Sequence, residues 1–198
     1  MTPTRTNRKQ QIIRAAKELF AKHGFKGTTT KMLAAKVGVS EATLYKYFTS
    51  KEDIYYALLE EKLQNIESYL PTSQKTSIRK TLEEIVVNFL EKNTDDVSFT
   101  KICLFAALEQ NAYSKNFVQK LRKKLFTHLD KLFENWISEK KIKELEPDLL
   151  AKLFFGLLFY TLLLRTIFHD EKFSQYNLQY LAQHIADIFL TGVLNETT

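Results

Sequence analysis

The residues whose chemistry stands out are the lysines and arginines of the first 51 positions. They number eleven against only two acids, Glu18 and Glu41, which gives this segment a net charge of +9. The whole chain carries +6, which leaves −3 for residues 52–198. A concentrated positive field attracts polyanions, which means nucleic acid, an anionic membrane or an acidic protein. A solvated basic surface without a partner is the alternative that charge alone leaves open. The basic residues are Arg5, Arg8, Lys9, Arg14, Lys17, Lys22, Lys26, Lys31, Lys36, Lys46 and Lys51.

Residue patterns for catalysis or metal binding are absent from the sequence. It contains no Gly-rich phosphate loop, no HExxH, no GxSxG and no paired carboxylates at helical metal-ligand spacing. Cys103 is the single cysteine, and the four histidines are scattered at His23, His128, His169 and His184. We therefore expect no enzyme, no metal site and no bound cofactor. One cysteine also fits a reducing, cytoplasmic location, and the polar, basic N-terminus does not have the apolar stretch of a signal peptide.

The composition predicts an all-α protein. Only five glycines and three prolines occur in 198 residues, too few for the many turns of a β-sandwich or barrel. The longest uncharged apolar run, Leu153 to Leu164, spans roughly 18 Å as a helix, against a hydrocarbon core of about 30 Å. We therefore expect a buried helix there and no membrane segment.

Hydrophobic periodicity and capping residues predict about nine helices. An amphipathic helix over 7–23 ends at His23-Gly24. A short helix follows Thr28-Thr29-Thr30 and runs through Val37, and Ser40 caps a third that continues to Phe48. A connector helix over about 50–69 begins with capping-box spacing, either Thr49 with Glu52 or Ser50 with Asp53, and Pro71 stops it. Five longer helices then follow, at about 75–93, 98–111, 115–140, 147–168 and 175–194.

Residues 32–48 have the pattern of two helices that cross at a steep angle. Ala34 allows close approach, and Gly38 can take the positive φ that a three-residue turn requires. Leu33, Val37, Val39 and Leu44 are expected to point inward. The outer face of the second helix then presents Glu41, Ala42, Thr43, Tyr45, Lys46 and Tyr47, as a recognition helix in the major groove does. Taken with the charge of +9, this pattern favours DNA binding over a structural helical corner.

Residues 8–59 resemble the N-terminal domain of the tetracycline-repressor (TetR) family of bacterial regulators. The matching pieces are Ile12–Phe20 (IIRAAKELF), Gly24-Phe25 with Thr28-Thr29, Leu33–Gly38 (LAAKVG), Val39–Phe48 (VSEATLYKYF) and Lys51–Ile54 (KEDI). The resemblance implies a helix-turn-helix DNA-binding domain over 1–51 and a ligand-binding and dimerisation domain of long helices over 52–198.

Carried over to matching positions, the resemblance implies specific DNA contacts. Thr29 and Lys51 are expected to bind phosphates, and Ser40 to cap the recognition helix. Glu41 and Ala42 occupy base-reading positions, although an acid facing DNA is unfavourable without a base donor. Thr43, Tyr45, Lys46 and Tyr47 are expected to contact the backbone or bases.

The resemblance also implies a ligand-responsive transcriptional regulator, most commonly a repressor, with activation as the alternative. It would bind a palindromic operator as a homodimer, through helices at about 147–168 and 175–194, and respond to a small apolar or aromatic effector. The helix containing Leu153–Leu164 is apolar all round, and Leu181, Ile185, Ile188 and Leu190 form a second stripe for the dimer. The residues expected to line the effector pocket are Phe89, Cys103, Phe105, Leu108, Phe126 and Phe155.

A membrane-surface or protein-interaction module is the remaining rival. It predicts exposed apolar anchors beside the lysines. The apolar residues of 1–51 are already used by the predicted three-helix core, so we expect DNA rather than a membrane as the partner.

Overall fold

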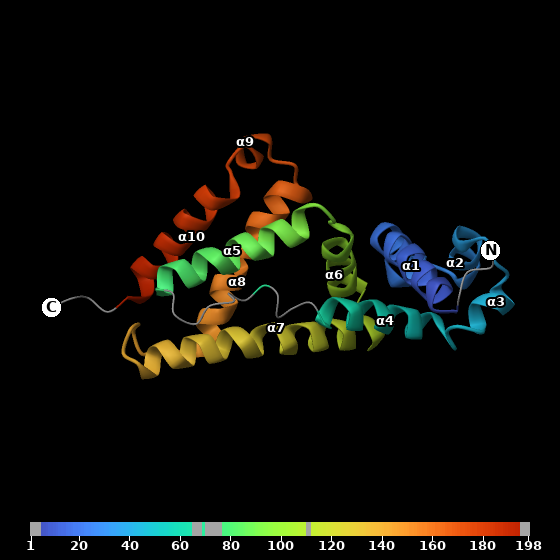
Figure 1. Ribbon diagram of the computed structural model, residues 1–198, viewed down its shortest axis with the longest axis horizontal. Coiled ribbons are helices and arrows are strands. Elements are labelled where there is room, and N and C mark those ends of the chain that lie inside the picture. Colours follow the sequence, from blue (N-terminus) through green and yellow to red (C-terminus); the bar gives the residue numbers. More distant parts are fainter. Residues whose placement is uncertain (1–4, 65–68, 70–76, 110–111, 195–198) are drawn as a thin grey trace. The chain divides into compact units, whose positions relative to one another are not determined.

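The computed structural model describes residues 5–64, 69, 77–109 and 112–194, with the side chains of residues 5 and 6 left out. In this part of the chain ten helices and no strand occur, which confirms the all-α prediction (Figure 1). The N-terminal four are α1 (Arg5–Gly27), α2 (Thr30–Val37), α3 (Glu41–Tyr45) and α4 (Lys51–Gln64). The others are α5 (Ile78–Thr94), α6 (Ser98–Glu109), α7 (Ala112–Ser138), α8 (Pro147–Thr166), the four-residue α9 (Glu171–Ser174) and α10 (Leu178–Val193).

The observed helix ends follow the local signals in the sequence. Pro147 occupies the first turn of α8, where its missing N–H costs nothing. Of the two possible capping boxes before α4, the structure uses Ser50, whose Oγ accepts a hydrogen bond from the Asp53 N–H at 3.1 Å. The predicted end of this helix near residue 69 and its stop at residue 71 involve stretches outside the described residues.

The chain divides into two compact units. The first contains residues 1–64 and 98–122, and the second contains residues 65–97 and 123–198. The first unit is larger than the predicted DNA-binding domain of residues 1–51, because α6 and the start of α7 pack with the N-terminal helices. Within this unit, α1 packs more extensively against α6 than against any other helix. No local pattern in the sequence indicates this pairing.

The core of the first unit is aromatic. Tyr55 of α4 lies at its centre and is 1% exposed. Its ring centroid is 5.1 Å from that of Phe20 in α1 and 4.6 Å from that of Phe117 in α7. Leu33 and Leu44, from the two helix-turn-helix helices, are buried in the same cluster. This shared core holds α2 and α3 against α1 and α4.

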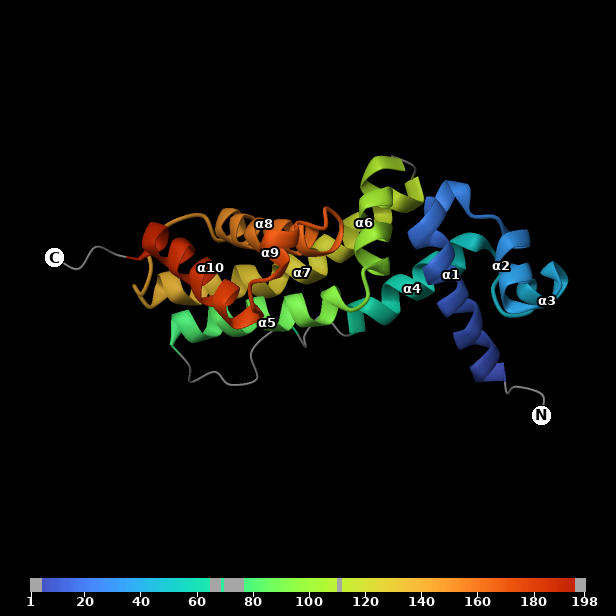
Figure 2. The ribbon, with the colours of Figure 1, turned by 90° about the horizontal axis from the view of Figure 1, so that it is seen from above.

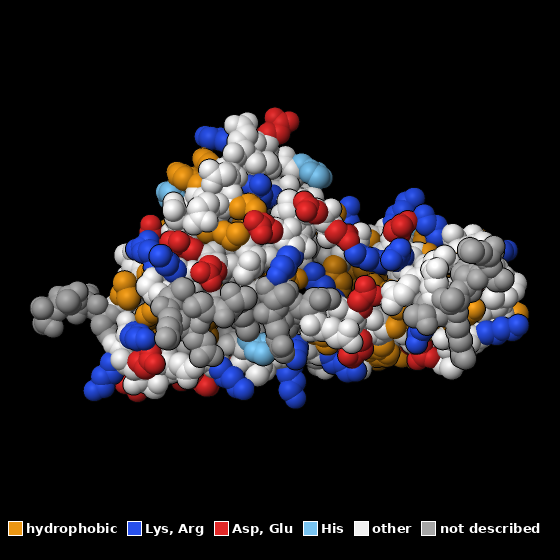
Figure 3. All heavy atoms as spheres, in the orientation of Figure 1, with side chains coloured by type: hydrophobic (Ala, Val, Ile, Leu, Met, Phe, Trp, Pro, Cys, Tyr) orange, Lys and Arg blue, Asp and Glu red, His pale blue; other side chains and the backbone are white. Residues whose placement is uncertain are grey.

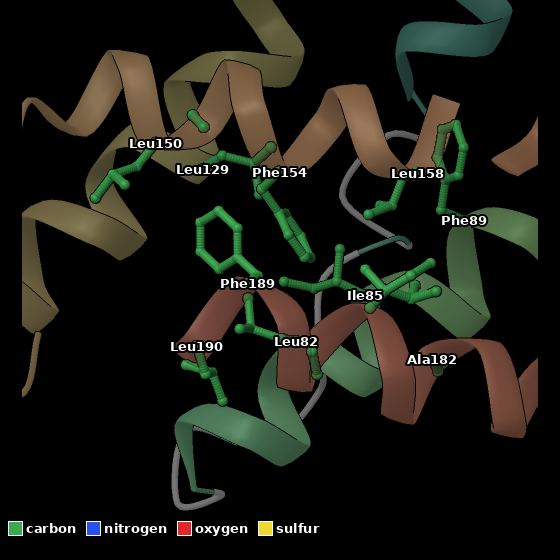
Figure 4. Packing of buried hydrophobic residues seen from close by; sticks show 14 of the residues in the cluster. Leu82, Ile85, Phe89, Leu129, Leu150, Phe154, Leu158, Ala182, Phe189 and Leu190 are labelled. Carbon is green, nitrogen blue, oxygen red and sulfur yellow. The ribbon is translucent and has the colours of Figure 1, made fainter. Parts of the chain in front are cut away.

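The core of the second unit is built by α5, α8, α10 and the second half of α7. Figures 1 and 2 show α5 and α10 side by side, and α8 packs against both. Phe154 of α8 and Phe189 of α10 meet at 5.1 Å between ring centroids, over a layer of leucine and isoleucine side chains (Figure 4). Leu82, Leu90 and Phe133 are fully buried in this cluster. Close packing of this kind makes each large core side chain worth several kcal/mol, about 2–5 for Leu or Phe truncated to Ala.

α8 is the one described helix that is long and apolar enough to cross a membrane by length and composition. The apolar run of twelve residues in the sequence is shorter than this helix, because α8 continues beyond both ends of the run and has 20 residues. The added part includes Lys152, which pairs with Asp148 one turn earlier. One such helix is weak evidence for a span, since core helices meet the same test. Phe154, Leu158 and Leu162 of α8 are buried in the core of their unit.

Candidate nucleic-acid interface and effector region

The turn between α2 and α3 has the geometry that the sequence predicted. Thr29 caps α2, and its Oγ1 accepts a hydrogen bond from the Met32 N–H at 3.1 Å. Gly38 ends α2 in the left-handed conformation, with φ of 72° and ψ of 39°. The Val39 N–H then donates to the Ala34 carbonyl at 3.0 Å, which closes the turn. Ser40 caps α3 by accepting from the Thr43 N–H at 3.1 Å.

The outer face of α3 is open to solvent. Leu44 and Phe48 are buried in the core of the first unit, as expected for the inward face. Of the residues predicted for the outer face, Tyr47 packs partly against this core. Thr43 and Tyr47 are half-buried, while the exposed members of the face are Glu41, Ala42, Tyr45 and Lys46. Ala42 and Tyr45 of α3, and Lys46 at its C-cap, therefore present a small, a phenolic and a cationic side chain to a partner. The predicted continuation of this helix to Phe48 is wrong, because α3 ends at Tyr45.

Glu41 has a partner inside the unit. Its Oε2 accepts a hydrogen bond from the Thr30 hydroxyl at 2.6 Å, at the N-terminal end of α2 where an anion is favoured. Glu18, the other acid of the first 51 residues, pairs with Lys36 at 2.7 Å. A carboxylate accepts hydrogen bonds on both oxygens, so Glu41 can keep Thr30 on Oε2 while Oε1 accepts from a base donor. Its assignment as a base-reading residue stays a prediction.

Lys51 faces the loop between α1 and α2. Its Nζ donates hydrogen bonds to the carbonyl oxygens of Phe25 at 2.7 Å and Thr28 at 2.8 Å, and it lies 4.2 Å from the Phe25 ring centroid. Burial lowers the pKa of this ammonium, partly offset by the nearby carboxylates of Glu52 and Glu109. Two of its three protons are used within the protein, so phosphate binding by Lys51 is a prediction that rests on the third.

The structure adds a residue that the sequence did not indicate. Glu109, at the end of α6, accepts a hydrogen bond on Oε1 from the Lys26 N–H at 3.0 Å. These residues are 83 positions apart, and no periodicity or motif connects them. A carboxylate near the end of an apolar helix is the only local signal, and it does not identify a partner.

α8 and α10 carry exposed apolar side chains on one face each. On α8 they recur at helical spacing, and on α10 they include Tyr180 at 44% and Ile188 at 69% exposed. Figure 3 shows hydrophobic side chains at the surface along α9 and α10. The exposed α8 residues are Leu149, Leu153, Leu157 and Tyr160.

The stripe predicted on the last helix is wrong in part. Leu181, Ile185 and Leu190 belong to the core of the second unit, and only Ile188 of that set is exposed. The side of α10 that packs into this core consists of Leu181, Ala182, Ile185, Ala186, Phe189, Leu190 and Val193.

The six residues predicted to line an effector pocket are divided between the two units, and their shared role stays a prediction. Phe89, Phe126 and Phe155 lie in the second unit, with both Phe89 and Phe126 at 5.5 Å from the Phe155 ring centroid. Cys103, Phe105 and Leu108 lie on α6 in the first unit. Leu108 is 78% exposed, and burial raises the pKa of the Cys103 thiol to about 12.

A small cavity adjoins two of the phenylalanines. Its volume is about 20 Å³, room for about one water molecule. The lining is almost wholly apolar and comes from Tyr69, Ile85, Phe89, Leu125, His128, Leu129, Phe155 and Leu158. A larger ligand would need these side chains to move apart.

Comparisons with known proteins agree with this geometry. The family model for bacterial regulatory proteins of the tetR family matches residues 12–58. The nucleoid occlusion factor SlmA of Haemophilus ducreyi is 32% identical over 141 residues, covering 69% of this chain and 68% of SlmA. The fatty acid metabolism regulator protein of Bacillus subtilis is 24% identical over 189 residues, covering 94% of this chain and 95% of its own length.

The same fold occurs in solved structures. The transcriptional regulator FadR from Bacillus subtilis, in complex with stearoyl-CoA, superposes with a TM-score of 0.74 at 24% identity, covering 92% of this chain and 98% of FadR. Its likeness at this identity shows a common fold. Together with the capped turn and the exposed face of α3, these relationships show that the chain belongs to the TetR family of bacterial regulatory proteins and is a DNA-binding transcriptional regulator, not an enzyme.

Proposed function

We propose that this protein is a cytoplasmic repressor that binds a palindromic operator as a homodimer and is released by a long-chain fatty acyl effector. The observation that carries the proposal is the outer face of α3, where Ala42, Tyr45 and Lys46 are exposed on a helix whose inner face is locked into a core. In this assignment residues 1–51 contain the DNA-reading surface and residues 52–198 provide effector binding and dimerisation.

The roles on DNA follow from chemistry and position. Ala42 meets a thymine methyl, Tyr45 and Lys46 reach base edges or the backbone, and Glu41 accepts from a cytosine amino group on Oε1 while Oε2 keeps Thr30. Phosphates are bound by hydroxyl groups, by amides at the start of α2 and α3, and by an ammonium. The residues assigned to the phosphates are Thr29, Ser40, Thr43, Tyr47 and Lys51.

Two copies are needed because one short recognition helix reads only a few base pairs. A dimer places two of them on a dyad, with half-sites roughly 34 Å apart or a multiple of that distance. The exposed apolar faces of α8 and α10 support this dimer. Leu153, Leu157 and Tyr160 on the first, and Ile188 on the second, would be covered by the same helices of a second copy.

A fatty acyl chain is the effector that the second unit suits best. The cavity beside Phe89 and Phe155 is lined by apolar side chains, which favour a hydrocarbon over a sugar or a charged chelate. Its present volume of about 20 Å³ means that binding selects a more open state. The full-length likeness to a Bacillus subtilis fatty acid metabolism regulator, and to FadR bound to stearoyl-CoA, supports the same effector class.

Stearoyl-CoA is expected to weaken binding to the operator. A difference of 1–3 kcal/mol in its affinity for the two states gives a loss of about 5–150-fold in operator affinity. The measurement is fluorescence anisotropy of a labelled operator duplex with and without stearoyl-CoA, with acetyl-CoA as the control for the nucleotide part. Release by both thioesters, or by neither, would contradict an acyl-chain effector.

A variant of the cavity makes this test specific. Phe155→Trp is expected to fill the cavity and reduce the response to stearoyl-CoA while operator binding without effector persists. Phe159→Trp is the matched control, because Phe159 stacks on Phe155 at 5.7 Å but does not line the cavity. Equal loss of response in both variants would place the effector elsewhere.

A further inference from the structure

Residues 24–28, called the Gly24–Thr28 loop below, comprise the kink at Gly24, the short last turn of α1 and the residue that precedes the N-cap of α2. Gly24 interrupts α1 with φ of 70° and ψ of −179°, a conformation that is essentially restricted to glycine. The Thr28 hydroxyl donates back to the Gly24 carbonyl at 2.8 Å, and Thr28 is fully buried. Because Thr29 follows at once as the N-cap of α2, the position of this loop sets the position of α2.

Two side chains of opposite charge hold the loop from other helices. Glu109 of α6 accepts from the Lys26 N–H, and Lys51 of α4 donates to the carbonyls of Phe25 and Thr28. An N–H group thus meets a carboxylate, and two carbonyls meet an ammonium. Hydrogen bonds with a charged partner are about twice as strong as neutral ones.

Glu109 is itself fixed by a buried hydroxyl. The Ser114 Oγ of α7 donates to Glu109 Oε2 at 3.1 Å, and Ser114 is fully buried. Ser114 also hydrogen-bonds to Tyr55 of α4, a residue whose pKa is raised by burial. The Glu109 carboxylate is therefore held by the Lys26 N–H from the loop and by the Ser114 hydroxyl from the core of the unit.

Gly24 leaves the space that the carboxylate occupies. A Cβ at this position would lie 2.2 Å from Glu109 Oε1 and 3.0 Å from Phe105. The approach of α6 to the loop thus requires glycine for its space as well as for its φ.

We propose that Glu109 is a positioning residue for DNA binding, which holds the Gly24–Thr28 loop so that Thr29 and the start of α2 are placed for the operator backbone. The inference rests on the proposed operator binding. For the removal of Glu109, the positioning role predicts weaker operator binding, whereas the change in charge alone predicts stronger binding. Removal of an acid from a DNA-binding protein strengthens its attraction to phosphates, whereas loss of this contact weakens the operator complex.

Glu109→Ala is expected to raise the operator Kd about tenfold, the effect of losing a charged hydrogen bond at a site that positions others. Its Kd for random duplex DNA is expected to stay unchanged or fall. Glu109→Gln keeps an oxygen for the Lys26 N–H and an amide for Ser114, so it restores most of the operator affinity. Glu60→Ala is the matched control, since it removes the same charge from an exposed position of α4 in the same unit.

A double-mutant cycle tests the spatial part of the proposal. Gly24→Ala pushes the carboxylate away from Lys26, so it should weaken operator binding on its own. In Gly24→Ala/Glu109→Ala that clash is absent, and the combined loss is expected to be smaller than the product of the two single losses. Losses that multiply would show that the two residues act independently.

The readouts separate positioning from folding and from the proposed function. Thermal unfolding and the fraction of active protein, measured by titration of the operator at concentrations well above Kd, report folding; the operator-to-random ratio reports positioning. Equal weakening of operator and random binding by Glu109→Ala, or no recovery in Glu109→Gln, would overturn the positioning role. If the unmodified protein selects no operator, the proposed function fails instead.

Discussion

Leu153→Glu is expected to convert the protein to a monomer and to weaken operator binding by at least about a hundredfold. Leu153 is 57% exposed on the apolar face of α8, with Leu149 and Leu157 one turn away on either side. In the proposed dimer it is covered by a second copy, where a carboxylate would be buried without a partner. Each monomer then brings a single recognition helix to DNA, and the gain from two linked half-sites is lost.

The measurement is sedimentation velocity at micromolar protein, together with operator affinity. Leu145→Glu is the matched control, because Leu145 is 41% exposed but precedes α8 and lies off this face. The control is expected to remain dimeric. A Leu153→Glu protein that still sediments as a dimer and binds its operator normally would place the dimer interface on another surface.

Tyr45→Ala is expected to weaken operator binding by about tenfold or more while random duplex binding changes little, because one good base contact contributes about 1–3 kcal/mol of discrimination. Tyr45 is 49% exposed on α3. Truncation of its side chain leaves the packing of the buried Leu44 in the core unchanged. The measurement is the ratio of Kd values for operator and random duplexes at one salt concentration.

Tyr45→Phe divides this effect between the ring and the hydroxyl. Recovery in Tyr45→Phe assigns the contact to ring packing against a base or sugar, and no recovery assigns it to a hydrogen bond. Equal losses on operator and random DNA in Tyr45→Ala would make Tyr45 a contact to the backbone and remove it from the base-reading set.

The helix-turn-helix was predictable because its signals are local. Gly38 and Ser40 act on backbone groups within a few residues, and the structure shows the turn and the cap that were predicted for them. Of the three threonines offered as caps of α2, the structure uses Thr29, and its phosphate contact stays a prediction. The inward side chains Leu33 and Leu44 follow the helical period and are buried as expected. Short-range capping and periodicity need no knowledge of the rest of the fold.

The parts that failed depend on long-range packing. On α10, periodicity identified apolar residues but not which of them face the core, so Ile185 and Leu190 were assigned to the dimer instead. The assembly of α6 with the N-terminal helices, and with it the role of Glu109, rests on a contact 83 residues apart. The residues predicted for the effector pocket belong to both units, Cys103 to the first and Phe155 to the second, and the pocket itself stays a prediction.

Selection of binding sites from a pool of randomised DNA duplexes tests the central claim most directly. The account predicts enrichment of one palindromic sequence, with two half-sites whose centres are separated by about one helical turn, 10–10.5 base pairs, or a multiple of it. The same selection with Tyr45→Ala should lose that enrichment at the positions which Tyr45 reads. A pool that remains unenriched, although the protein binds DNA in a salt-dependent manner, would contradict a sequence-reading role for α3.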